Sequence, residues 1–299
     1  MKLGLSSGKV TFLYGNENGF KMIKKAGFDT VDINVSAYLG KEDCIFKKSE
    51  DEISTHFYNL KKICDDVELE ISQTHGLFTP CVPDEELAKQ TRWEAEMVLK
   101  ATSLLNSPYC VFHNVKLKQW EEVSLSDETM LSENKKFFGD FLTPLCEKYN
   151  VGFSMETHGR TILKEGSVLD FVGDTYNLRK SFDMIESDYK SFCLDTGHSN
   201  EAHYYGACDV AETTKILGKD IKTLHLHDNQ GFYDSHLMPL IGAQGAVEWD
   251  KVFDILDEVG YKGSYNWELN LGYFGNYLEE SLPFIGSYLR RFTENKGRM

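Results

Sequence analysis

Short apolar runs alternate with longer amphipathic segments along the whole chain. Runs of this length, rich in β-branched and aromatic side chains, predict buried strands. The expected strands are 2–5, 30–34, 69–74, 109–112, 152–155, 191–194, 221–226 and 263–267. Segments with helical spacing of apolar residues lie between and after them, at 17–26, 50–66, 84–105, 126–148, 168–178, 207–217, 249–258 and 278–293.

This order of elements predicts the architecture. Strand-then-helix units that follow one another without a linker indicate a parallel sheet. Eight such units in 299 residues fit a (β/α)8 TIM barrel, one domain spanning 1–299, better than a doubly wound sheet. The 6 prolines and the absence of a Ser/Gly-rich stretch give no sign of a domain boundary. A barrel also places its active site at the C-terminal ends of its strands.

Charge and composition narrow the choice of partners. The 32 basic and 47 acidic residues give a net charge of −15, whereas a nucleic-acid binder needs a basic surface, so no nucleic-acid partner is expected. No apolar run approaches the ~20 residues of a membrane span, and the first residues do not form a signal peptide. The 7 singly spaced cysteines favour a reduced, cytoplasmic protein. The 13% aromatic content leaves room for a homo-oligomer interface.

Ionisable residues gather where the predicted strands end. Of 9 histidines, seven lie at strand ends or in the loop after the seventh strand: His75, His113, His158, His198, His225, His227 and His236. Glu156 and Glu268 end apolar runs, where an unpaired buried carboxylate is costly, and Asp195 ends the sixth strand. Carboxylates with imidazole suit a divalent cation such as Mn²⁺, Co²⁺, Zn²⁺ or Mg²⁺.

Each of these residues also has a structural interpretation. A single histidine at a strand end, such as His75 or His113, is often a hydrogen-bonded structural residue, and Asp195 before Thr196-Gly197 is also a typical turn former. His225 and His227 are two residues apart on one strand, so their side chains point to the same side. The sequence leaves open whether His225 binds the ion or supports a residue that does.

Five strings at these strand ends resemble the sugar phosphate isomerase/epimerase superfamily, the xylose isomerase-like TIM barrels. They are Glu156-Thr157-His158-Gly159, Leu194-Asp195-Thr196-Gly197-His198, His225-Leu226-His227-Asp228-Asn229, His236-Leu237-Met238-Pro239 with Gly245 and Trp249 after it, and Trp267-Glu268. The resemblance implies a divalent metal held by Glu156, Asp195, His227 and Glu268. It also implies substrate contacts from the remaining strand-end histidines His75, His113, His158, His198 and His236.

The resemblance implies a reaction as well. Glu156 and Glu268 would act as acid and base on opposite faces of a small sugar or keto-inositol, through an enediolate that the metal stabilises. Return of the proton to the other face gives epimerisation, and return to the neighbouring carbon gives isomerisation. The chain departs from ketose 3-epimerases after His227, because Asp228-Asn229-Gln230-Gly231 contains no arginine. No basic cluster follows the last two strands, so an unphosphorylated substrate is predicted.

Other functions use similar residues. The endonuclease IV branch of the superfamily holds three zinc ions with nine ligand residues. This chain has residues of compatible type at nine positions: His75, His113, Glu156, Asp195, His198, His227, Asp234, His236 and Glu268. The acidic charge and the His-Leu-Met-Pro string favour sugar chemistry over this multinuclear phosphoesterase. A related dehydratase or lyase would use His158, Lys116 or His236 to protonate a leaving hydroxyl. A carbohydrate-binding barrel without activity would have little use for clustered carboxylates.

Overall fold

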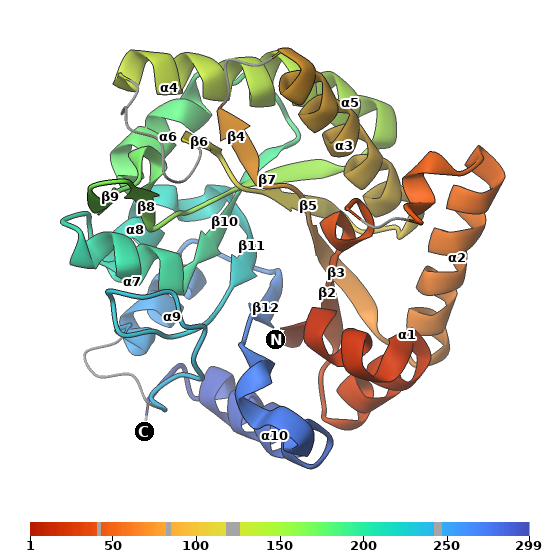
Figure 1. Cartoon of the computed structure of the whole chain (residues 1–299). Helices are drawn as coiled ribbons and strands as arrows, with labels where there is room; N and C mark the ends of the chain where they lie inside the picture. The colour runs from red at the N-terminus through yellow and green to blue at the C-terminus, as the bar shows by residue number, and fades with distance from the viewer. Residues whose placement is uncertain (41–42, 82–84, 118–125, 242–246, 299) are drawn as a thin grey trace.

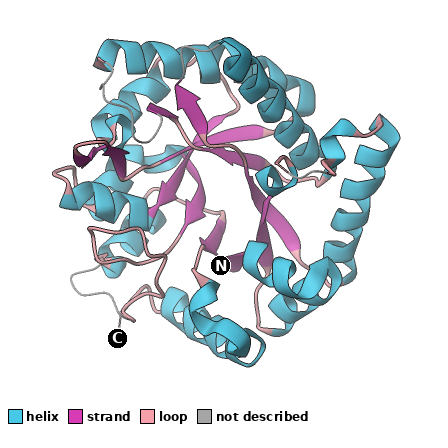
Figure 2. Cartoon of the chain, viewed as in Figure 1, coloured by secondary structure: helices cyan, strands magenta, loops and turns pink. Residues whose placement is uncertain are grey.

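The structure, a computed structural model, describes residues 1–40, 43–81, 85–117, 126–241 and 247–298. An 8-stranded parallel sheet forms its centre, in the order β11-β10-β7-β5-β3-β2-β1-β12, with helices around it (Figures 1 and 2). The strands are β1 (Lys2–Ser6), β2 (Thr30–Asn34), β3 (Glu70–His75), β5 (Tyr109–Phe112), β7 (Gly152–Glu156), β10 (Lys190–Asp195), β11 (Ile221–His225) and β12 (Ser264–Trp267).

The two edges of this sheet meet and close the ring. A parallel bridge joins Leu226 to Trp267, just beyond the end of β11 and at the end of β12. The Leu226 N–H donates to the Asn266 carbonyl at 2.8 Å, and the Glu268 N–H donates to the Leu226 carbonyl at 3.0 Å. The (β/α)8 barrel that the order of elements predicts is therefore confirmed.

Helices surround the barrel on its outer side. They are α1 (Gly8–Lys25), α2 (Glu50–Asp66), α3 (Glu85–Leu104), α4 (Asp127–Asn134), α5 (Thr143–Tyr149), α6 (Thr175–Asp183), α7 (Thr196–Tyr204), α8 (Val210–Leu217), α9 (Trp249–Glu258) and α10 (Leu278–Glu294). Short helical segments are η1 (Val35–Tyr38), η2 (Ile45–Lys47), η4 (Phe171–Gly173), η5 (Gly218–Asp220) and η6 (Leu271–Tyr277), and the π-helix η3 (Lys135–Leu142) joins α4 to α5. Within the described ranges, no helix is both long and apolar enough to cross a membrane.

Local sequence explains where the helices begin and which face they bury. In α2, the Ser49 side chain accepts the Glu52 N–H while the Glu52 carboxylate accepts the Ser49 N–H, a capping box that starts the helix. Ile53, Phe57 and Leu60 then recur at helical spacing and are buried in the apolar core. The predicted bounds 50–66 and 249–258 match α2 and α9.

Other predicted helices need correction. The segment 168–178 is not helical at its start, because β9 (Gly166–Leu169) pairs with β8 (Arg160–Leu163) in an antiparallel hairpin. The helix expected at 17–26 begins at Gly8 and is broken at Gly15, whose φ of 75° lies in the left-handed region. Helix α7 was not predicted at all, and a short parallel pair, β4 (Thr79–Cys81) with β6 (Val115–Leu117), adds to the rim.

Polar side chains occupy the inside of the barrel near the C-terminal strand ends. Asp32, Gln73, Glu156, Asp195 and His225 are all at most 2% exposed. Large apolar side chains on the barrel strands, among them Phe153, Phe192 and Trp267, pack on the other side against the helices. The fold therefore collects charged groups from distant segments of the chain in one buried place.

Candidate active site

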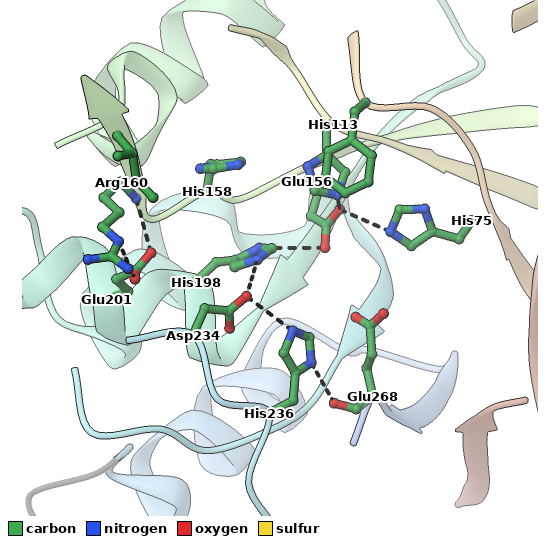
Figure 3. A pocket seen from close by; sticks show the side chains of 12 residues that line it. His75, His113, Glu156, His158, Arg160, His198, Glu201, Asp234, His236 and Glu268 are labelled. Atoms are coloured by element: carbon green, nitrogen blue, oxygen red, sulfur yellow. Dashed lines mark hydrogen bonds and ion pairs between the residues drawn. The ribbon is translucent and has the colours of Figure 1, made fainter. Parts of the chain in front are cut away.

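A cavity of about 240 Å³ opens at the C-terminal ends of the strands (Figure 3). Both predicted acid/base residues and all five histidines predicted to contact substrate line it. The lining residues are His75, Phe78, His113, Glu156, His158, Arg160, Ile162, His198, Glu201, Asp234, His236 and Glu268. Asp195 and His227 are fully buried and are not among these lining residues.

The strand ends bring one carboxylate-rich group together. Glu156, Asp195 and His225 are the last residues of β7, β10 and β11, and Glu268 directly follows β12. One ligand atom from each of these four lies within 4.8 Å of the others, a spacing that could hold one metal ion. His225 therefore occupies, in this group, the place that the resemblance gives to His227.

His227 lies beside this group and contacts Asp195. Its Nε2 is 3.0 Å from Oδ1 of Asp195, and its ring stacks on the ring of His236 with centroids 3.8 Å apart. A Cβ at Gly197 would lie 1.9 Å from the His227 ring, so only glycine leaves room for this imidazole. The glycine of the Asp195-Thr196-Gly197-His198 string is thus explained by packing.

The same string begins a helix. The Asp195 carboxylate caps α7 by accepting the His198 N–H at 2.6 Å, and Asp195 has the extended conformation of an N-cap residue. Asp195 and His198 are therefore joined through a helix start and not through a simple tight turn. The cap leaves the other oxygen of Asp195 facing His198 and His227, at 3.7 and 3.2 Å.

Three of the lining histidines share one hydrogen-bonding pattern. Nδ1 lies near a backbone carbonyl in each: 3.2 Å from Gly76 O for His75, 3.1 Å from Thr157 O for His198 and 2.9 Å from Glu268 O for His236. A carbonyl only accepts, so Nδ1 of each ring carries a proton, and Nε2 is the nitrogen that points into the cavity. Loss of the Nε2 proton would free each of these rings to bind a metal ion or to accept a hydrogen bond from a substrate.

The Nε2 atoms of these three rings and of His113 lie near carboxylates. His113 Nε2 is 2.9 Å from Oε2 of Glu156, and His75 Nε2 is 3.8 Å from the same oxygen. On the other side of the cavity, His198 and His236 both reach Oδ2 of Asp234, at 3.4 and 3.1 Å (Figure 3). Two more groups that could hold an ion result: His75 with His113 and Glu156, and His198 with Asp234 and His236.

Charge pairing sets the protonation of the site. Burial opposes ionisation of Glu156, but the charges of His113 and His225 outweigh it and hold the pKa of the Glu156 carboxyl well below its ordinary range. Burial likewise opposes charge on His236, yet its hydrogen bond to Asp234 helps to raise the pKa of its imidazole to about 9. The carboxylates thus stay ionised and the imidazoles supply the compensating charge.

Asp32 on β2 is a site residue that the sequence reasoning missed. Its Oδ2 is 2.9 Å from Nε2 of His225, while Nδ1 of the same ring is 2.7 Å from Oε1 of Glu156. The Gln73 side-chain amide donates to Oδ2 of Asp32 at 3.1 Å. A carboxylate inside the apolar run 30–34 was the available signal, because such a residue is rarely buried without a partner.

Arg160 and Glu201 were missed as well. They lie at the end of the cavity away from His75 (Figure 3), with Nε of Arg160 3.1 Å from Oε1 of Glu201. The Arg160 guanidinium also donates to the Tyr205 hydroxyl at 3.2 Å. A Cβ at Gly159 would lie 2.1 Å from Oε2 of Glu201, which accounts for the glycine of the Glu156-Thr157-His158-Gly159 string.

Other motif residues have structural roles. Buried Asp228 accepts the Trp249 indole N–H at 3.1 Å and the Leu240 N–H at 3.3 Å, so it holds the start of α9 and the chain at Leu240 beside the end of β11. Gly245 and the side chain of Lys116 lie outside the described part of the chain.

Comparison with known proteins places these features in context. The family described as xylose isomerase-like TIM barrel matches residues 20–284. A relative from Sinorhizobium fredii, y4fM, is 27% identical over 164 residues, which is 55% of this chain. The alignment with y4fM covers 48% of that relative. A second alignment, with MJ1311 from Methanocaldococcus jannaschii, covers 38% of MJ1311. The chain therefore spans about half or less of the length of the curated relatives it matches.

Solved structures resemble the whole chain. A D-tagatose 3-epimerase-like protein has a TM-score of 0.73 and 21% identity and covers 99% of both chains. D-psicose 3-epimerase from Clostridium cellulolyticum H10 has a TM-score of 0.72, 13% identity and full coverage of both chains. The IOLI protein with a bound zinc atom has a TM-score of 0.69 and 17% identity, covering 99% of this chain and 98% of the other. Because these sequence identities are at most 21%, the similarity shows a shared fold only.

Proposed function

The chain belongs to the xylose isomerase-like TIM barrel family, and from that premise we propose that it is a divalent-metal-dependent sugar isomerase or epimerase. The observation that carries the proposal is the buried group of Glu156, Asp195, His225 and Glu268, whose ligand atoms lie within 4.8 Å of one another. Sugar epimerases and a zinc-binding protein among the similar structures support it.

The residues fit a divalent cation. Three carboxylates and one imidazole form a mixed oxygen and nitrogen set that suits Mn²⁺, Co²⁺, Zn²⁺ or Mg²⁺. Oδ1 of Asp234 is also buried and accepts no hydrogen bond from the described residues, so it too can receive a cation or a substrate hydroxyl. We propose His225 as the imidazole ligand in the place assigned to His227, because its ligand atom and not that of His227 belongs to the four-residue group.

Glu156 and Glu268 are the proposed acid and base. Both carboxylates approach Nδ1 of His225, at 2.7 and 3.3 Å, and both line the cavity. Burial opposes their ionisation, but neighbouring histidines lower both pKa values, so each can accept a proton at neutral pH. When bound, a divalent cation would polarise the substrate's carbonyl and adjacent hydroxyl and stabilise the enediolate.

The rest of the cavity sets the size and polarity of the substrate. Its volume of about 240 Å³ lies just below the usual range for ligand sites of ~300–1,000 Å³, so the reacting unit is small. His158 and His198 offer imidazoles to sugar hydroxyls, with their rings stacked at 5.2 Å. Arg160 is the one arginine or lysine among the described lining residues, and Glu201 already neutralises it, which favours an uncharged sugar.

Proton transfer next to a carbonyl can be observed directly. The purified protein is incubated in D₂O with Mn²⁺, Co²⁺, Zn²⁺ or Mg²⁺ and a panel of free ketoses, aldoses, keto-inositols and keto-glycosides. Metal-dependent deuterium uptake at the carbon beside the carbonyl is expected for at least one compound. Absence of uptake with every sugar and metal would contradict the proposal.

A multinuclear phosphoesterase is the second candidate, and one observation favours it. The two further groups, His75 with His113 and Glu156 and His198 with Asp234 and His236, could each hold an ion beside the first. Against it stands the net charge of −15, which repels a DNA backbone. Metal analysis separates one ion from three per chain, and cleavage of abasic-site DNA without any deuterium uptake by sugars would favour this candidate.

A further inference from the structure

Two further hollows follow the catalytic cavity across the mouth of the barrel. The second, of about 290 Å³, shares His75, His236 and Glu268 with the catalytic cavity. The third, of about 530 Å³, shares Gly8, Lys9 and Asn34 with the second. His75 lies at the end of the catalytic cavity away from Arg160 (Figure 3), so the three hollows form one row that leads from Arg160 toward α1.

The chemical character changes along this row. Imidazoles and carboxylates dominate the catalytic cavity, whereas Phe12, Phe20, Ile33, Tyr38 and Leu60 give the third hollow a largely apolar wall. Lys9 and Asn34 stand at the border between the second and third hollows, and Lys9 forms no ion pair within the described ranges. A ligand that extended along the row would therefore have a polar end, a polar middle and an apolar end.

Phe12 is placed unusually for a large apolar side chain. It is 82% exposed although it lines the third hollow. Its position follows from the break of α1 at Gly15, where φ is 75° and ψ is 164°, since the preceding residues form a separate short turn over the barrel end. An aromatic ring held in water beside a cavity gains by covering an apolar ligand group.

We propose that the third hollow is a second subsite for an apolar ring attached to the reacting sugar, so that the substrate is a glycoside. This inference rests on the proposed sugar chemistry, because the reacting unit would occupy the catalytic cavity. Lys9 and Asn34 would lie beside the linkage or the hydroxyls next to it. The apolar ring and the reacting sugar would thus belong to one substrate, because neighbouring hollows in the row share lining residues.

The proposal also defines the carbonyl that reacts. A glycoside has no free carbonyl at its anomeric carbon, so a ketone must stand at another ring carbon. One glutamate takes the proton from the carbon beside that ketone, and the electron pair moves to the carbonyl oxygen as the enediolate forms. The other glutamate, as a carboxylic acid, delivers a proton to the opposite face and so restores the ketone. No oxidant or reductant is consumed in this step. A reaction that oxidises a ring hydroxyl of a glycoside must therefore supply the substrate.

Equilibrium binding tests the subsite without turnover. The Mn²⁺-loaded protein is titrated calorimetrically with phenyl and with methyl glucosides of both anomers. Burial of the phenyl ring should make at least one phenyl glucoside bind tenfold or more tightly than its methyl counterpart. Equal affinity of phenyl and methyl glucosides would overturn the proposal.

Two variants locate the effect. Phe12→Ala removes the exposed ring, and Ala37→Trp fills the hollow from an exposed position, so neither needs a core side chain. Each should reduce the phenyl advantage at least fivefold and leave methyl glucoside binding within twofold. Phe284→Ala, which removes a 61% exposed ring on α10, is the matched control and should retain the advantage. Retention of the full phenyl advantage in both test variants would overturn the proposal.

Two outcomes separate this inference from the proposed function. Deuterium uptake by free sugars without a phenyl advantage would reject the subsite alone, whereas a phenyl advantage that depends on Phe12, with no uptake by any sugar, would reject the function alone. If light scattering shows that Phe12→Ala converts a dimer into monomers without changing phenyl binding, the Phe12 surface contacts a second copy and the subsite is rejected.

Discussion

The imidazole Nε2 of His225 lies 2.9 Å from Oδ2 of Asp32, although the two residues are separated by 193 positions in the sequence. The Asp32 carboxylate accepts a hydrogen bond from the Nε2–H of His225. Nδ1 of the same ring then points at the carboxylates of Glu156 and Glu268, at 2.7 and 3.3 Å. A carboxylate behind a histidine is how proteins fix the orientation and tautomer of a metal-binding ring. Asp32 is therefore a positioning residue for the proposed metal site.

Asp32→Asn is expected to weaken metal binding while the fold is retained. The amide can no longer act as a negatively charged acceptor for His225, and loss of such a supporting partner typically costs about 10- to 100-fold in metal affinity. Competition titration with a chromogenic chelator measures the change, with the exposed Asp43→Asn as the control. Unchanged metal affinity in Asp32→Asn would show that Asp32 does not position the ring.

His225 and His227 are distinguished by paired substitutions. His225→Ala removes an atom of the four-residue group and should abolish stoichiometric metal binding. His227→Ala removes a ring that contacts Asp195 and His236, and should reduce metal affinity by a smaller factor. Metal content after dialysis, measured by mass spectrometry, decides between them. A reversed order would return the ligand role to His227.

The structure shows which parts of this site the sequence could predict. Short apolar runs located all strands of the barrel, because buried parallel strands have few polar positions. The sequence could not decide which of His225 and His227 is the ligand, since a spacing of two puts both side chains on one face of a strand. Asp32 was missed because its partner lies on a distant strand that only closure of the barrel brings near.

Helix α7 was missed for a different reason. Its buried residues are mostly polar or small, among them His198, Ser199, Asn200 and Glu201, so it has no apolar stripe. His198 and Glu201 line the cavity, whereas Ser199 and Asn200 are buried with hydrogen-bond partners behind it. The Ser199 hydroxyl donates to the Asp195 carbonyl at 2.7 Å, and Asn200 donates to Asn229 at 2.8 Å. The sequence pattern therefore failed where polar contacts, and not apolar packing, decided which residues are buried.

Gly197→Ala tests the packing of His227 against α7. In a helix this change is ordinarily stabilising, but here the new methyl group would lie 1.9 Å from the His227 ring and force it to move. A loss of about 1–3 kcal/mol in the free energy of unfolding is expected from urea denaturation. Gly40→Ala, where the added Cβ meets nothing within 4 Å, is the control and should change stability by less than about 0.5 kcal/mol. Equal stability of the two variants would refute the steric explanation.

Metal binding should strengthen as pH rises. Burial opposes protonation of His225, but nearby groups, among them Glu268 and Glu156, hold the pKa of its imidazole well above its ordinary range. A protonated nitrogen cannot bind a cation, so metal binding by His225 must release a proton. Metal affinity measured between pH 6 and 9 should increase by up to about tenfold per pH unit for each proton released. An affinity independent of pH would show that this ring is not a ligand.

Deuterium uptake from D₂O at the carbon beside a sugar carbonyl, followed by proton NMR, tests the central proposal most directly. Uptake is expected with Mn²⁺ or Co²⁺ and should disappear on addition of a chelator. Glu268→Gln should remove uptake even in samples whose metal content is matched to that of the unaltered protein, because the amide cannot accept a proton. Metal-independent uptake, or full uptake by metal-loaded Glu268→Gln and Glu156→Gln, would contradict metal-dependent proton transfer by these two carboxylates.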